Sequence, residues 1–200
     1  MLQSVHILKV VSTMSDELLR VDPQPTYIPR LNTDGMQGNP YWYSRNPFYI
    51  AGVGLPNCTC YAWGRFWENA DINGDYSNRP NLSTGNAQDW FGYNDGYQRG
   101  NIPELGAIAC YAGGDFSGLG HVCVIEEIHE DYCVTSNSAW NGQYFYLVNI
   151  ALNGAYPYGH YSFQGFIYNP YSGGGGGWAH KIKPWLLKRE LYNRELELIR

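Results

Sequence analysis

One helical pattern followed by a series of strand-like runs most constrains the fold of this 200-residue chain. Between Cys58 and about Asn69, apolar side chains recur at the three- and four-residue spacing of a helix. The polar connection that follows is expected to hold a short helix near residues 86–91. Strand-like runs then occur at residues 107–111, 121–129, 132–136, 144–152 and 165–168. A helix followed by successive strands is typical of an α+β domain in which the helix packs on an antiparallel sheet.

The composition argues against several classes of function. The formal net charge is −5, so an electrostatic footprint for nucleic acid is not expected. No stretch approaches the roughly 18 apolar residues of a membrane-spanning helix. The apolar patch within residues 1–20 lacks the basic start and the small-residue cleavage site of a signal peptide, so we predict a strand there.

The cysteines point to a protein made in a reducing compartment. Cys58 and Cys60 are too close in sequence for an easy disulfide, and Cys110, Cys123 and Cys133 lie in strand-like runs where buried free thiols are common. No second pair of cysteines or histidines follows at the spacing of a zinc site. Free thiols are therefore predicted, and neither a metal nor a cofactor is expected.

Four segments are expected along the chain. Residues 1–34 form an N-terminal segment, and residues 35–170 form the main domain. Residues 171–177 are a glycine-rich linker, which is typical of a flexible connection. Residues 178–200 are charged and net basic, and a helix with a leucine stripe is predicted over 184–200. We expect this helix to dock on another protein, with docking on its own domain or attraction to an anionic wall as alternatives.

The predicted start of the first helix carries the strongest chemical signal. Cys58 follows a proline-bearing loop and opens the helix, where first-turn N–H groups and the helix dipole stabilise a thiolate. This position favours Cys58 over Cys60 as a nucleophile. A lone cysteine in an apolar setting is more often part of the core, so the signal needs a partner.

Two residues later in the chain could act together with Cys58. His121 opens a strand-like run after two glycines, and its imidazole could accept a thiol proton. A turn near residues 130–131 would pair the next run antiparallel with it and return Asn137 to the His121 end. There the amide oxygen could orient the imidazole, as in papain-like enzymes. Taken singly, the histidine could be a surface residue and Asn137 a turn residue.

Five segments in order resemble the CHAP domain, the cysteine, histidine-dependent amidohydrolase/peptidase module of bacteriophage lysins and bacterial wall hydrolases. The resemblance covers about residues 35–170 and implies a papain-like α+β fold. It also implies cleavage of amide bonds in peptidoglycan. The segments are 57–62, 106–109, 120–122, 136–142 and 165–169.

The resemblance also implies roles for individual residues. Cys58 matches the family's nucleophile and His121 its general base, while Asn137 falls where the family often has Glu. The Cys58 backbone N–H and Asn57 are expected to stabilise the oxyanion. Trp140 is expected to line the substrate groove, with a core position as the alternative. Cys60 stands where relatives often have Trp, which implies a packing role, and Ala139 stands where they often have Asn.

The family suggests a biological setting. Some phage relatives bind calcium just before the cysteine, but residues 46–53 contain no carboxylate, so no metal is expected here. We expect a virion lysin that acts on the Gram-positive wall during genome entry and contacts other phage tail proteins through residues 184–200. The alternatives are a free endolysin released on host lysis and a non-catalytic tail protein with the same fold.

Overall fold

A computed structural model describes residues 29–71, 73–115, 117–140 and 142–171 of the chain. The segments predicted for residues 1–28 and 172–200, including the docking helix, lie outside the described residues, as does most of the glycine-rich linker. Within the described part, no helix is long and apolar enough to cross a membrane.

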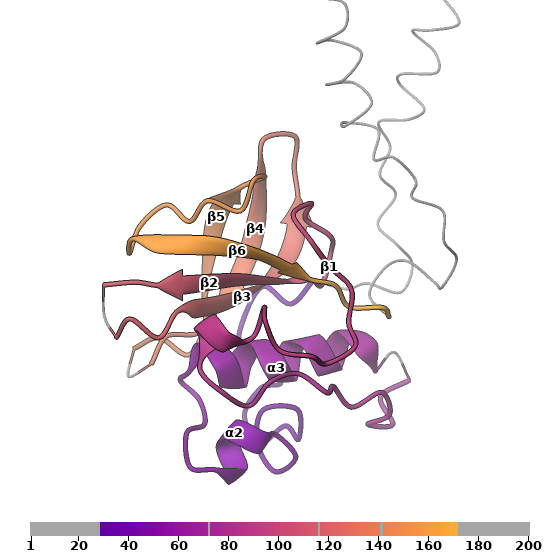
Figure 1. Cartoon of the computed structure of the whole chain (residues 1–200). Coiled ribbons are helices and arrows are strands. Elements are labelled where there is room, and N and C mark those ends of the chain that lie inside the picture. Colours follow the sequence, from indigo (N-terminus) through magenta and orange to yellow (C-terminus); the bar gives the residue numbers. More distant parts are fainter. Residues whose placement is uncertain (1–28, 72, 116, 141, 172–200) are drawn as a thin grey trace, which may run out of the picture. The chain divides into compact units, whose positions relative to one another are not determined.

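The described part contains two α-helices, one 3-10 turn and an antiparallel sheet of six strands (Figure 1). The sheet order is β1-β6-β2-β3-β4-β5, and every neighbouring pair is antiparallel. The predicted α+β class is therefore confirmed. The bounds are α2 Pro47–Ile50, α3 Cys58–Ala70, η1 Ala87–Asp89, β1 Arg99–Gly100, β2 Ile108–Gly113, β3 His121–Ile128, β4 Tyr132–Asn137, β5 Tyr146–Ala151 and β6 Tyr161–Ile167.

The sheet buries side chains on both of its faces, as the alternation of each strand requires. In β2, Ile108 and Cys110 join the cluster around α3, whereas Ala109 and Tyr111 join a second cluster on the opposite face. Figure 1 shows α3 running along one face of the sheet, with α2 on the far side of the helix. The helix lies between the sheet and the segments that precede and follow it in sequence.

Helix α3 is buried around most of its circumference because loops cover the side that the sheet leaves open. Met36, Trp42 and Trp90 pack in the same cluster as the helix side chains. At Gly64 a β-carbon would meet the Trp42 indole and the Tyr41 carbonyl oxygen at 2.5–2.7 Å. A glycine is therefore required where the loop crosses the helix.

The structure corrects two details of the predicted elements. Strand β6 begins at Tyr161, four residues before the predicted start, and the register between β2 and β6 shifts beside Cys110 and Tyr111. The predicted helix near residues 86–91 is a single 3-10 turn. By contrast, α3 begins at Cys58 as predicted and ends one residue after the predicted end.

Candidate active site

Cys58 lies at the first helical position of α3, and an asparagine cap fixes that helix start. The Asn57 Oδ1 atom accepts hydrogen bonds from the Thr59 backbone N–H at 3.0 Å and from the Thr59 hydroxyl at 2.8 Å. The Asn57 Nδ2 group donates to the Val53 carbonyl oxygen at 2.9 Å. Capping thus takes up the side-chain oxygen of Asn57 and one of its two amide protons.

The Cys58 sulfur sits beside the start of β3. Burial raises the pKa of the Cys58 thiol to about 11, and hydrogen bonds from the backbone N–H groups of Val122, Thr59 and Cys58 itself oppose that rise. Val122 directly follows His121, so this contact places the thiol beside the start of the strand that carries the imidazole. At neutral pH the isolated site therefore holds a thiol surrounded by N–H donors that favour the thiolate.

His121 is buried at the start of β3, with only 5% of its surface exposed. Three tyrosine rings surround the imidazole, with centroid distances of 6.4 Å to Tyr111, 5.4 Å to Tyr156 and 5.5 Å to Tyr161. This burial lowers the pKa of His121 to about 4, although the hydrogen bond to Asn137 acts in the opposite direction. The imidazole is therefore neutral at neutral pH and able to accept a proton.

Asn137 lies at the end of β4 and contacts His121, as the antiparallel turn predicted. The pairing of Val124 with Ser136 brings the two strand ends together. The distance between His121 Nε2 and Asn137 Oδ1 is 2.9 Å. The Tyr156 hydroxyl also donates to this oxygen, at 3.1 Å.

A chain of hydrogen bonds fixes which nitrogen of His121 carries the proton. The Asn137 Nδ2 group donates to the Thr135 carbonyl oxygen and to Thr135 Oγ1, each at 3.0 Å, and Thr135 Oγ1 donates to the Val148 carbonyl oxygen at 2.9 Å. Carbonyl oxygens only accept, so the amide oxygen of Asn137 must face the imidazole. His121 Nε2 is then the donor, and Nδ1 is left with a lone pair.

Ser138 links the strand that carries Asn137 to the helix that carries Cys58. Its hydroxyl accepts a hydrogen bond from the Asn57 backbone N–H at 3.0 Å and donates to the Gln143 carbonyl oxygen at 3.2 Å. No sequence pattern predicted Ser138, Thr135 or Tyr156 as part of the site. Ser138 directly follows Asn137, which is the one local hint, whereas nothing in the pattern around Tyr156 indicates that its loop reaches this site.

Trp140 is exposed rather than part of the core, with 59% of its surface accessible. The core position left open by the sequence is therefore excluded. Tyr144 and Tyr158 are also exposed, with 50% and 56% of their surfaces accessible. Cys60, in contrast, is fully buried, and its thiol donates to the Trp42 carbonyl oxygen at 3.6 Å, in agreement with the predicted packing role.

Comparison with protein families gives one match. Residues 49–139, which run from α2 to just beyond Asn137, match the sequence profile of the CHAP domain. The chain carries a CHAP domain. The match supports a broad assignment as a hydrolase of the amidase or peptidase type acting on peptidoglycan. Comparisons with curated proteins and with solved structures found no match.

Proposed function

We propose that this CHAP domain hydrolyses amide bonds of peptidoglycan with Cys58 as nucleophile, His121 as general base and Asn137 as the residue that orients the imidazole. The observation that carries the proposal is the 2.9 Å contact between His121 Nε2 and Asn137 Oδ1, beside a thiol at a capped helix start. Nδ1 of His121 then takes the proton of the Cys58 thiol. This division of roles is papain-like, as is the placement of the nucleophile on a helix packed against the sheet.

The proposed reaction is acyl transfer in two steps. The Cys58 sulfur attacks the amide carbonyl carbon while its proton passes to His121, and the imidazolium then protonates the leaving amine. The Cys58 backbone N–H stabilises the oxyanion, and the second Nδ2 proton of Asn57 is available for the same purpose. Water activated by His121 hydrolyses the thioester. Trp140 contributes an exposed aromatic face for the glycan or peptide.

We also propose the biological role that the family suggests. A phage virion lysin acting on the Gram-positive wall is our first candidate, and a free endolysin or a non-catalytic tail protein is the alternative. Incubation of the purified chain with Gram-positive walls, followed by mass spectrometry of the released fragments, tests for turnover and identifies the bond that is cut. Walls that remain intact would favour the non-catalytic alternative.

The pH dependence of hydrolysis should reflect the buried imidazole. We expect kcat/KM to rise as the pH increases through the His121 pKa of about 4, because only the neutral imidazole accepts the thiol proton. The rate should then stay level through neutral pH. Initial rates on a soluble peptidoglycan fragment, measured in small pH steps, provide the test. An acid limb centred near the ordinary histidine value of about 6.5 would contradict it.

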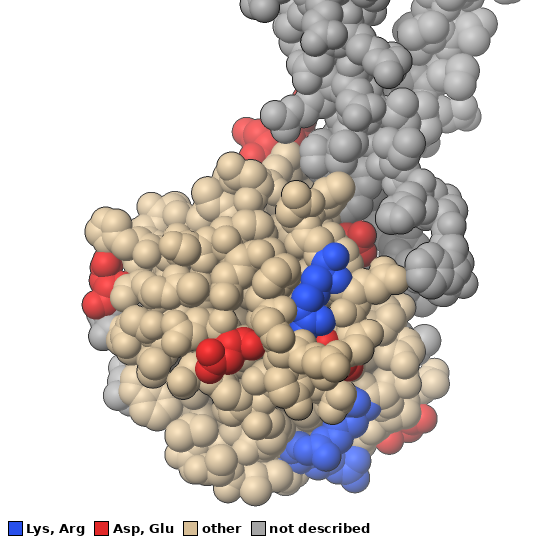
Figure 2. Space-filling model, in the orientation of Figure 1, with Lys and Arg blue, Asp and Glu red and all other residues tan. Residues whose placement is uncertain are grey.

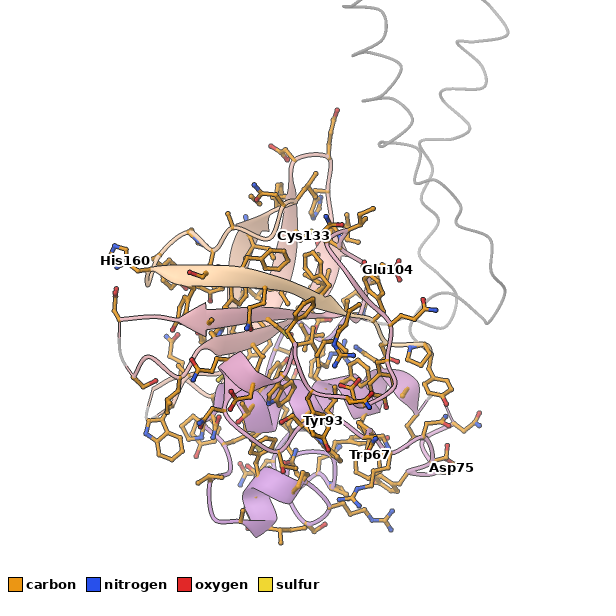
Figure 3. All side chains as sticks on the ribbon, viewed as in Figure 1. Trp67, Asp75, Tyr93, Glu104, Cys133 and His160 are labelled. Atoms are coloured by element: carbon orange, nitrogen blue, oxygen red, sulfur yellow. The ribbon has the colours of Figure 1, made fainter. Side chains whose placement is uncertain are left out.

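Acid unfolding could produce a similar loss of rate, so circular dichroism is needed at each pH. Because the folded pKa of His121 lies below the unfolded value, the unfolded chain binds more protons between about pH 6.5 and 4. The free energy of unfolding therefore decreases as the pH falls through this window. The control variant is His160→Gln, since the His160 side chain is 90% exposed at one end of β6 (Figure 3). It should leave the acid limb unchanged.

Asn137→Ala should lower kcat about 100-fold with a smaller change in KM. The substitution removes the acceptor that holds His121 Nε2, and a misplaced catalytic group costs on the order of 10² in rate. The matched variant is Tyr156→Phe, which removes one hydrogen bond to Asn137 Oδ1 and keeps the amide. We expect a loss of several-fold in kcat from Tyr156→Phe, through less constrained orientation of Asn137. Equal rates for Asn137→Ala and the parent would exclude the orienting role.

A further inference from the structure

The arginines of the described domain differ in whether they have an acidic partner. Residues 29–171 contain five arginines, no lysine and twelve acidic residues, so this part is strongly acidic. Three of the arginines form ion pairs with carboxylates, whereas Arg45 and Arg79 form none within the described residues. Arg30 pairs with Glu68, Arg65 with both Glu126 and Glu68, and Arg99 with Asp95.

Arg45 and Arg79 line the same surface hollow. The hollow has a volume of about 360 Å³, and its walls come from the segment before α2, from α2, from the end of α3 and from the loop after it. In Figure 2 the larger basic patch on the face shown lies over the region where Figure 3 labels Trp67. The lining residues are Ser44, Arg45, Ile50, Trp67, Tyr76 and Arg79.

Aromatic rings hold both guanidinium groups in place. The Arg45 guanidinium lies 4.8 Å from the Tyr76 ring centroid, and that of Arg79 lies 5.4 Å from the Trp63 ring centroid. Arg79 also donates to the Arg45 carbonyl oxygen at 3.4 Å. A guanidinium held over an aromatic ring still has N–H donors at its edge for a planar anion, and the ring contact lowers the entropy that binding would cost.

The carboxylates nearest in sequence to Arg79 make other contacts. Asp71 Oδ2 accepts hydrogen bonds from the Tyr41 hydroxyl and from the Tyr76 backbone N–H, both at 2.6 Å, so this buried carboxylate is occupied. Asp75 Oδ1 accepts from the Ser77 backbone N–H at 2.9 Å. Neither forms an ion pair with Arg45 or Arg79, so no direct ion pair engages either arginine within the described residues.

We propose that this hollow binds an oxyanion, a phosphate or carboxylate group carried on an anionic polymer. The two arginines lie over aromatic rings and form no ion pair within the described residues, and they supply the positive charge and the forked donors that such a group needs. Trp67 lies nine residues after Cys58 on α3, about 14 Å along the helix axis, so the hollow is separate from the candidate active site. Oxyanion binding is independent of the proposed hydrolysis. The assignment of the polymer to the bacterial wall, in contrast, rests on the proposed hydrolysis of peptidoglycan.

Direct titration of the full chain tests whether the hollow binds an oxyanion. Sodium phosphate is added to isotopically labelled protein, and the arginine Nε–H signals are followed by NMR, with sodium chloride at equal ionic strength as the reference. We expect the Arg45 and Arg79 signals to shift together and to saturate, while the signals of the three paired arginines stay in place. Equal small shifts for all arginines, or no shift, would overturn the proposal.

Binding to purified walls tests the use of the hollow. Variants are made in the Cys58→Ala background, so that the wall is not degraded, and binding is measured by sedimentation. Replacing both Arg45 and Arg79 by lysine keeps the charge but removes the planar fork. We expect this double variant to bind about tenfold more weakly, the factor for losing one charge-assisted hydrogen bond. Affinity equal to that of the parent would exclude a built site.

Treated walls distinguish the two sources of the oxyanion. Removal of phosphodiester polymers with hydrogen fluoride should abolish the difference between parent and double variant if phosphate is bound. Amidation of wall carboxyl groups should abolish it if carboxylate is bound. A difference that survives both treatments would contradict an oxyanion ligand. With cysteine restored at position 58, the lysine variant should cleave a soluble fragment at the parent rate, so failure of catalysis and failure of binding are read separately.

Discussion

Cys58→Ala is expected to lower the rate of peptidoglycan hydrolysis by about 10⁴-fold or more, because the acyl-enzyme can no longer form. The side chain is small and only half-buried, and its backbone N–H, the Asn57 cap and the Ser138 bridge are all retained. The free energy of unfolding should therefore change by less than about 1 kcal/mol. Release of free amino groups from purified walls measures the rate, and urea unfolding measures the stability.

Cys60→Ala is the matched control for the nucleophile. The two cysteines are separated by one residue on α3, but Cys60 is fully buried and its thiol contacts the Trp42 carbonyl oxygen. Burial also raises the pKa of the Cys60 thiol, to about 12. We expect Cys60→Ala to destabilise the fold by about 1–2 kcal/mol and to keep most of the activity. Loss of turnover in Cys60→Ala with normal turnover in Cys58→Ala would reverse the assignment.

The sequence could predict the parts of the site that depend on local pattern. Helical spacing and the loop before Cys58 place the cysteine at a helix start, and the structure has α3 begin there. The turn after His129 implies antiparallel pairing of the two strands. Counting residues along each strand from the turn then places Asn137 near His121. Both predictions depend on neighbours in sequence, for which periodicity and turn length are reliable guides.

Other features depend on contacts between distant segments, and no local pattern reveals them. Tyr156 reaches Asn137 from a connection between β5 and β6 whose path is set by tertiary packing. The start of β6 was missed because Gln164 interrupts the apolar run and the register shifts nearby. The hollow joins Arg45 to Arg79, which lie 34 residues apart. Such sites become visible only when the loops are folded over α3.

A buried ion pair between α3 and β3 is a further feature that sequence patterns do not predict. Arg65 is 2% exposed and Glu126 fully buried, and two hydrogen bonds join them: Nε to Oε1 at 2.9 Å and Nη2 to Oε2 at 2.8 Å. The Ser136 hydroxyl donates to Glu126 Oε1 at 2.5 Å. Charged residues on a helix and a strand are normally predicted to face solvent, so helical and strand periodicity alone assign both side chains wrongly.

Glu126→Ala is expected to lower the free energy of unfolding by about 3–5 kcal/mol, because it removes a buried carboxylate from the buried Arg65 guanidinium, which keeps its ion pair with Glu68. That is a large part of the roughly 5–15 kcal/mol that stabilises a typical domain. Urea unfolding followed by tryptophan fluorescence provides the measurement. Glu127→Ala is the matched control, since Glu127 is 36% exposed and pairs with the partly exposed His129, and it should change the stability by less than about 1 kcal/mol.

A double variant separates the cost of a buried charge that has lost one partner from the net contribution of the Arg65–Glu126 pair. Replacing Arg65 by Met and Glu126 by Leu removes both charges and keeps apolar volume between α3 and β3, so most of the stability lost in Glu126→Ala should return. The pair would then serve mainly to fix how α3, and with it Cys58, sits on the strand that begins at His121. Recovered stability together with a lowered kcat would support that role. A Glu126→Ala variant as stable as Glu127→Ala would contradict the buried pair itself.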